Sequence, residues 1–153
     1  MVRSPTLALV AVLVAAASPA STPPPPTAPG AEHELLVENT DRGTFFRIRL
    51  RAGEVFSVVS QHSIYDQPVT EDFVVDEEGH IVLRAVTSPS AAVREYFGIT
   101  SAGERHAVAR TMPEIVFRIA TGTPQRLRAG GVERSFLELG EHGDRLVLRA
   151  RPS

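Results

Sequence analysis

The stretch TFFRIRLR, residues 44–51, alternates between apolar and charged side chains from its third position onward. The apolar positions are Phe46, Ile48 and Leu50, and the charged positions are Arg47, Arg49 and Arg51. A repeat of two residues is typical of a β-strand with one face against a core and the other in water. We expect acidic residues such as Glu34 or Glu38 on a neighbouring strand to pair with this arginine stripe; docking of an acidic partner is the alternative.

The same alternation recurs along the chain and predicts an all-β fold. Further strands are expected over residues 54–60, 69–76, 81–86, 114–120, 125–129, 132–136 and 145–149. Among the turns between them, Gly130-Gly131 is the strongest hairpin signal, because both residues accept a positive φ angle. A two-residue turn there would place Arg128 opposite Glu133. Short strands joined by tight turns predict an antiparallel meander that forms a small barrel or sandwich.

One segment departs from the strand pattern and predicts a short helix over residues 89–97. Ser88 suits the N-cap, Pro89 the first turn and Gly98 the end. The residues that would share one helical face, and pack it on the sheet, are Ala92, Val93, Tyr96 and Phe97. Residues 100–112 carry only scattered apolar side chains and are expected to form a long loop.

The N-terminal segment has the features of a secretory signal peptide over residues 1–20. Arg3 precedes the apolar run 7–17, and small residues follow at 18–20. Residues 21–32 include four consecutive prolines, which favour an extended polyproline linker. Residues 33–153 would then form a single β domain. We expect this domain to be exported to the periplasm or the outside of the cell, tethered to the membrane if the leader is not cleaved.

The composition argues against several classes of function. The chain of 153 residues has a formal net charge of -2 and no cysteine. A disulfide partner and a thiolate metal site are therefore excluded, and nothing favours nucleic-acid binding. There is no Gly-x-Ser-x-Gly elbow for a serine hydrolase. None of the histidines has the spacing of metal ligands on one element, so neither a metal nor another cofactor is expected: they are His33, His62, His80, His106 and His142.

A histidine and a glutamate stand out on consecutive strands. Alternation places His62 and Glu71 each on a mainly apolar face. If Asp66 and Gln67 formed the turn, the two side chains would lie opposite each other on the buried side. A hydrogen bond between them would offset the cost of burying either group. Such a pair could fix the register of the hairpin, or it could orient the histidine for acid–base work or ligand binding. No catalytic residue is assigned.

The sequence around this pair resembles a known family. The matching residues are His62-Ser63-Ile64-Tyr65, Pro68-Val69, Glu71 and Phe73, which fit the motif HS-V/I-x-x-x-P-V-x-E-x-F/Y of domain of unknown function 1850. The resemblance continues more loosely over residues 54–149, and it departs from the family at 101–110, where members carry a tryptophan. It implies a small extracytoplasmic protein encoded beside TRAP transporters of the TAXI type, which import organic acids. It implies no activity.

Three functional hypotheses follow. The first is a non-enzymatic accessory or binding module outside the cytoplasm, with transporter subunits or a small organic solute as partner. The second is a β-barrel that binds a small ligand, with His62 and Glu71 at its mouth. The third is an enzyme that uses the same pair. A cavity of several hundred cubic ångströms would favour the second hypothesis.

Overall fold

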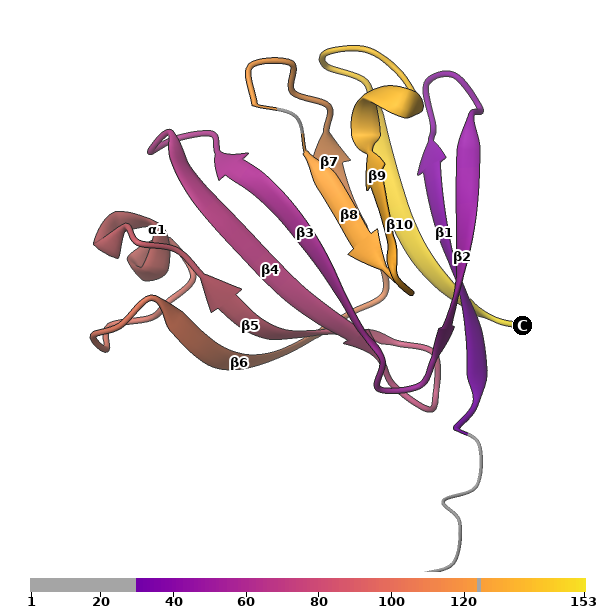
Figure 1. Ribbon diagram of the computed structural model, residues 1–153, viewed down its shortest axis with the longest axis horizontal. Helices are drawn as coiled ribbons and strands as arrows, with labels where there is room; N and C mark the ends of the chain where they lie inside the picture. Colours follow the sequence, from indigo (N-terminus) through magenta and orange to yellow (C-terminus); the bar gives the residue numbers. More distant parts are fainter. Residues whose placement is uncertain (1–29, 124) are drawn as a thin grey trace, which may run out of the picture.

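The computed structural model describes residues 30–123 and 125–153. The expected signal peptide, residues 1–20, and residues 21–29 of the expected linker lie outside this part of the chain. Within it, ten strands form two antiparallel sheets, with one short α-helix (Figure 1). The predicted all-β fold is confirmed. The two sheets remain separate, so the molecule is a sandwich and not a closed barrel.

The smaller sheet has four strands in the order β2-β1-β10-β7. The bounds are β1 Glu32–Asn39, β2 Phe45–Arg51, β7 Ile115–Arg118 and β10 Arg145–Pro152. The first and last strands of the domain are therefore neighbours, with Leu36 opposite Arg149. Strand β1 begins one residue before the expected domain boundary at 33.

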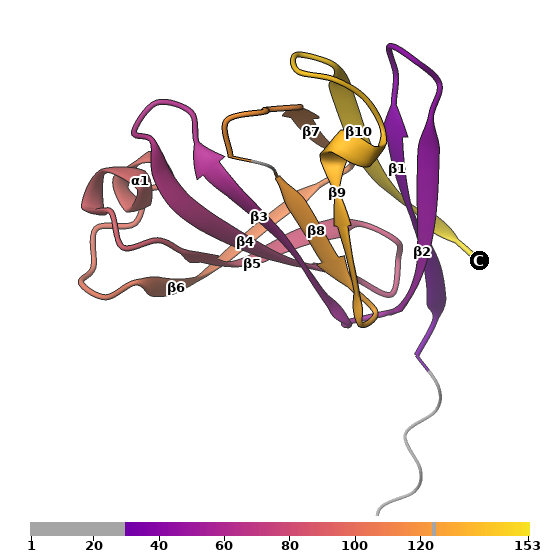
Figure 2. The same cartoon turned by 45° about the horizontal axis from the view of Figure 1, so that its top comes forward.

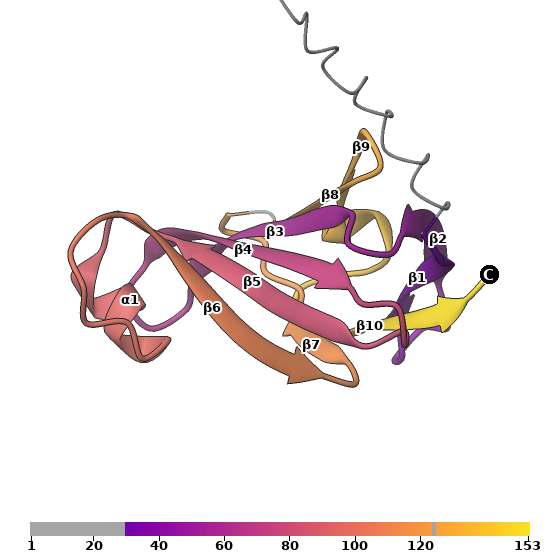
Figure 3. The same cartoon turned by 90° about the horizontal axis from the view of Figure 1, so that it is seen from below.

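The larger sheet has six strands in the order β6-β5-β4-β3-β8-β9. The bounds are β3 Val55–His62, β4 Gln67–Val75, β5 Ile81–Thr87, β6 Arg105–Met112, β8 Arg126–Ala129 and β9 Val132–Ser135, followed by the 3-10 helix η1 Phe136–Glu138. Strands β3 to β6 form the predicted meander, which Figure 3 shows from below. The meander does not extend over the whole domain, because β8 returns to pair with β3.

The core lies between the inner faces of the two sheets. Phe56 and Phe73 are opposite each other on β3 and β4, and their rings stack at 5.3 Å. Buried side chains from the smaller sheet meet them from the other layer, among them Leu35, Val37, Leu146 and Leu148. Each such side chain contributes about 1.5–3 kcal/mol through removal from water.

The strand with the arginine stripe, β2, lies at an edge of the smaller sheet. Its three arginines are outside the core, while Phe46 and Leu50 are buried. Arg47 forms an ion pair with Glu34 at 3.0 Å, as expected for a solvated face. Glu38 instead pairs with Arg149 on the opposite side of β1. Exposed pairs of this kind add little stability, typically about 0–1 kcal/mol.

The hairpin between β8 and β9 confirms the prediction made from Gly130-Gly131. Both glycines have positive φ angles, +55° and +75°. Arg128 is opposite Glu133, and its Nε donates a hydrogen bond of 2.6 Å to the carboxylate. The two glycines therefore fix the register of this hairpin.

The helix is shorter than predicted. Helix α1 covers Ala91–Tyr96, with Ser90 as its N-cap. Ser88 lies two residues before this cap: its hydroxyl donates to the carbonyl of Pro68 at 2.8 Å, which fastens this segment to β4, and accepts from the N–H of Ser90 at 3.3 Å. Of the expected apolar face only Val93 is fully buried, whereas Tyr96 is 61% exposed. The helix ends before Gly98 (φ +78°), as predicted.

The long loop predicted over residues 100–112 is wrong in its second half, where the chain forms strand β6. This strand lies at the edge of the larger sheet and most of its side chains are exposed. An edge strand needs few apolar residues, so its alternation is weak in the sequence. Among the described residues, no helix is long and apolar enough to cross a membrane.

Candidate functional site

The register of the β3–β4 hairpin differs from the one expected. His62 lies opposite Gln67, and Glu71 lies opposite Val58. The pairing is displaced by four residues, which corresponds to about 13 Å along a strand. An even displacement keeps every side chain on its predicted face. His62 and Glu71 therefore share the inner face, but no hydrogen bond or ion pair joins them in the described part of the chain.

The turn explains this displacement. It contains four residues, 63–66, and not the two-residue turn of Asp66 and Gln67. Asp66 adopts a left-handed conformation, with φ 49°, and its N–H donates to the carbonyl of His62 at 2.8 Å. The side chain of Gln61 closes the turn from outside with a hydrogen bond of 2.8 Å to the carbonyl of Asp66. A tight two-residue turn would need positive φ at both central positions.

His62 is enclosed by aromatic rings. Its imidazole stacks on Tyr65 at 5.2 Å and meets the edge of Tyr96 at 4.6 Å, with Phe97 at 6.5 Å. Its Nδ1 accepts a long hydrogen bond of 3.4 Å from the N–H of Ile64. A neutral imidazole that accepts at Nδ1 carries its hydrogen on Nε2. His62 can therefore donate one hydrogen bond from Nε2.

Glu71 is a half-buried carboxyl without a hydrogen-bond partner among the described residues. Its removal from water raises the pKa of Glu71 from 4.5 to about 7, although the positive charge of Arg110 acts in the opposite direction. At neutral pH the side chain is present both as the acid, which donates a hydrogen bond, and as the carboxylate, which accepts one.

The inner face of the hairpin forms the floor of a cleft of about 530 Å³. His62, Glu71 and Val69 line this floor, and Tyr96 and Phe97 of helix α1 form one wall. The opposite wall is the segment 116–120, which contains most of β7. In Figures 1 and 3, α1 and β7 lie on the same side of the larger sheet. The cleft exists because four strands only partly cover a sheet of six.

A second hollow of about 440 Å³ adjoins the first, with Gln61, His62 and Ser63 in common. Its other side is the loop after β7, including Gly122 and Thr123. Figure 2 shows the β3–β4 turn and this loop at the same end of the sandwich. His62 therefore stands where the cleft opens toward solvent.

Strand β7 presents one free edge to the cleft. The backbone of Ile119 bonds on the β10 side of the strand: its N–H donates to the Asp144 carbonyl, and its own carbonyl accepts from the Gly143 N–H. Strand geometry then directs the N–H and carbonyl groups of residues 116, 118 and 120 to the other edge. The Gln125 side chain bonds there: its Nε2 donates to the Arg118 carbonyl at 2.9 Å, and its Oε1 accepts from the Ala120 N–H at 3.0 Å.

The remaining motif residues have structural positions around this site. Tyr65 and Ser63 belong to the turn, and Pro68 lies early in β4. Phe73 is buried in the core against Phe56 and does not line the cleft. The motif thus combines the floor of the cleft, the turn at its mouth and one core anchor.

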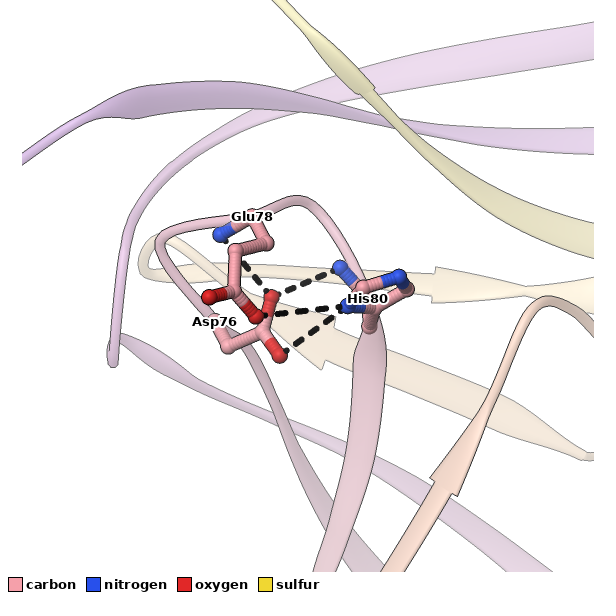
Figure 4. A group of neighbouring side chains, drawn as sticks. All are labelled: Asp76, Glu78 and His80. Carbon is pink, nitrogen blue, oxygen red and sulfur yellow. Dashed lines mark hydrogen bonds and ion pairs between the residues drawn. The ribbon is translucent and has the colours of Figure 1, made fainter.

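One other group of side chains could hold a metal ion. Asp76, Glu78 and His80 lie on the turn between β4 and β5, with ligand atoms within 4.8 Å of one another (Figure 4). Both His80 and Glu78 are exposed, and Asp76 already bonds the backbone N–H groups of residues 78 and 80. The contact of His80 with the two acidic residues was not predicted from the sequence. These internal bonds account for the arrangement without an ion.

The sequence analysis also missed Gln125 and the aromatic enclosure of His62. Of the rings around His62, Tyr65 stands in the family motif, and Tyr96 and Phe97 stand on the predicted helical face. Comparisons of this chain with models of protein families, with curated proteins and with solved structures find no match.

Proposed function

We propose that this chain is an exported, non-enzymatic binding module that takes a ligand into the cleft between α1 and β7. The observation that carries the proposal is the cleft itself, about 530 Å³ with aromatic and aliphatic walls. Pockets of this size and lining, with a few polar groups that fix orientation, are typical of ligand sites. His62 and Glu71 are the polar groups on its floor.

The geometry favours binding over catalysis. An acid–base enzyme built on His62 and Glu71 would need the two groups within hydrogen-bond reach. They are instead four residue pairs apart along the hairpin, with Glu71 opposite Val58 and His62 opposite Gln67. The desolvated carboxyl and the Nε2 donor are suited to hold two different parts of one ligand.

The cellular setting of the proposal comes from the resemblance to domain of unknown function 1850. On that basis the module serves a TRAP-type solute transporter in the periplasm or at the cell surface. Two observations test this setting: adjacency of the gene to a TRAP permease and its binding protein, and the mass of secreted material. A mature protein that begins at Ser21 is expected, and a full-length cytoplasmic product would contradict export.

Ligand binding is tested by a thermal-shift screen with small carboxylic acids, amino acids and short peptides. We expect at least one compound to raise the melting temperature of the wild type and to lose its effect in Tyr96→Ala and His62→Ala. Phe45→Ala is the matched control, since Phe45 is an exposed aromatic residue outside the cleft. A screen without any stabilising compound, or with shifts unchanged in both cleft variants, would contradict the proposal.

A further inference from the structure

We propose that the ligand of the cleft is an extended segment of another polypeptide, which adds a fifth strand to the smaller sheet along the free edge of β7. This inference rests on the proposed function and names the class of ligand. Peptides that bind in this way obtain affinity from backbone hydrogen bonds and specificity from alternate side chains.

The edge of β7 that faces away from β10 exposes backbone groups that a further strand could bind. The N–H and carbonyl of Val116 and the N–H of Arg118 point away from β10, and within residues 30–123 and 125–153 β7 has no second strand neighbour. They line the cleft together with the side chains on its floor. A pairing strand would form hydrogen bonds with these backbone groups, which otherwise bond only to water.

The side chain of Gln125 already pairs with one part of this edge. Its side-chain amide donates to the Arg118 carbonyl and accepts from the Ala120 N–H, as the N–H and carbonyl groups of one residue on an adjacent parallel strand would. Further along the same edge, at Val116, no side chain of the described residues replaces a pairing strand in this way. Gln125 therefore marks the end of the binding edge, next to which a peptide of three or four residues pairs.

The acidic side chain on the floor of the cleft indicates which side chains the peptide carries. In an added strand, alternate side chains face the floor of the cleft. Glu71 lies on that floor without an ion-pair partner among the described residues, between aliphatic and aromatic groups such as Val69 and Phe97. A ligand with one arginine or lysine facing Glu71, flanked by apolar residues on the same face, matches this surface.

The segment of this chain before residue 30 does not have the sequence expected of the ligand. Gly30 lies beside Ala52, and Ala52 lines a different hollow, with Asp76 and Glu77. Residues 4–29 contain no arginine or lysine, and prolines occupy 23–26. Proline cannot donate to a strand ladder. A separate polypeptide is therefore the occupant.

The experiment selects binders from a random heptapeptide library against the full chain. We expect enriched peptides to carry a central arginine or lysine between β-branched residues and to lack proline. N-methylation of alternate backbone amides of a selected peptide should weaken binding at least tenfold, because it removes the pairing donors. Replacing the basic residue by glutamate should have an effect of similar size.

Two protein variants locate the peptide. Arg118→Pro removes one outward N–H, which an edge strand tolerates, and should weaken binding at least tenfold. Arg118→Ala changes the side chain but keeps that N–H, so Arg118→Pro should bind the peptide at least fivefold more weakly than Arg118→Ala. Glu71→Gln should weaken binding of the arginine peptide about tenfold and leave a norleucine analogue unchanged.

The outcomes separate this inference from the proposed function. Selected peptides that are indifferent to N-methylation and to Arg118→Pro would overturn strand addition, as would self-association of the chain through β7. A small solute that binds in the cleft while no peptide is enriched would overturn the peptide inference and leave the binding function standing. Failure of both screens would overturn both.

Discussion

Glu71 and His62 face the same cleft from the same hairpin, with the Ser60–Val69 pair between them. Each group is therefore surrounded differently. His62 is enclosed by rings at the mouth, whereas Glu71 lies on the floor, where removal from water dominates its titration. The two groups are expected to respond independently to substitution, and the burial of Glu71 links stability to pH.

Glu71→Gln is expected to stabilise the protein at pH 8 and to have little effect at pH 4. The pKa of Glu71 rises from 4.5 to about 7 on folding. Between these values the unfolded chain has lost the proton that the native state keeps, so stability falls as pH rises and the full penalty applies above 7. At about 1.4 kcal/mol per unit the penalty is about 3 kcal/mol, reduced to roughly 2 for a half-buried group.

Denaturant unfolding of the variant and the wild type at pH 4, 6 and 8 checks this prediction. Glu77→Gln is the control, because Glu77 is exposed on a turn. An equal stability difference at all three pH values would show that the carboxyl of Glu71 is not desolvated.

His33→Leu is expected to stabilise the protein by about 1–2 kcal/mol. His33 is 3% exposed, and neither of its ring nitrogens has a hydrogen-bond partner in residues 30–123 and 125–153. Burying a polar group without a partner costs free energy that an apolar side chain avoids. Thermal melts measure the change, with the exposed His142→Leu as control; a destabilised His33→Leu protein would mean that the histidine does have a partner.

Gly140→Ala is expected to destabilise the protein by about 1–3 kcal/mol. A Cβ atom at this position would overlap the amide of Asn39 and the carboxylate of Asp144. The Asn39 amide is buried and donates to the Leu139 carbonyl at 3.1 Å and to Asp144 at 2.9 Å, so it has little freedom to move. Gly122→Ala, where a Cβ meets no atom within 4 Å, should be nearly neutral in the same denaturant melts. Equal melts for both variants would contradict the prediction.

A protein consisting of residues 30–153 is expected to fold by itself. The buried core begins at His33 and Leu35 on β1, and the strands of both sheets lie within this range. Far-UV circular dichroism should show a β spectrum, and amide NMR signals should be dispersed. A soluble but unfolded product would show that residues before 30 contribute to the fold.

The elements that could be predicted from sequence are those in which patterns of neighbouring residues determine the structure. Strand β2 follows from its alternation, and the β8–β9 hairpin follows from two adjacent glycines. Strand β6 could not be predicted, because an edge strand exposed on most positions leaves little hydrophobic pattern. The start of α1 was placed two residues too early, because the sequence does not tell a serine that caps a helix from one that binds another strand: Ser90 is the cap, and Ser88 bonds to Pro68.

The candidate site was predicted in part for the same reason. Alternation placed His62 and Glu71 correctly on the inner face, since face depends only on the period of the strand. Their separation depended on the conformation of Asp66, whose left-handed backbone extends the turn to four residues. The wall of the cleft opposite α1 comes from β7, which follows Glu71 by more than forty residues in the chain. No pattern of neighbouring residues indicates that these segments meet.

The pairing of β1 with β10 has a consequence for how the chain acquires its structure during synthesis. The four strands of the β3–β6 meander can pair with one another once residue 112 has emerged from the ribosome, whereas β1 obtains its central neighbour only with residues 145–152. Until then the apolar run 35–37 has at most β2 beside it. Such non-local pairing slows folding and prolongs the exposure of apolar segments that can aggregate. Loss of β10 would therefore leave a chain that aggregates, not one that folds with a smaller sheet.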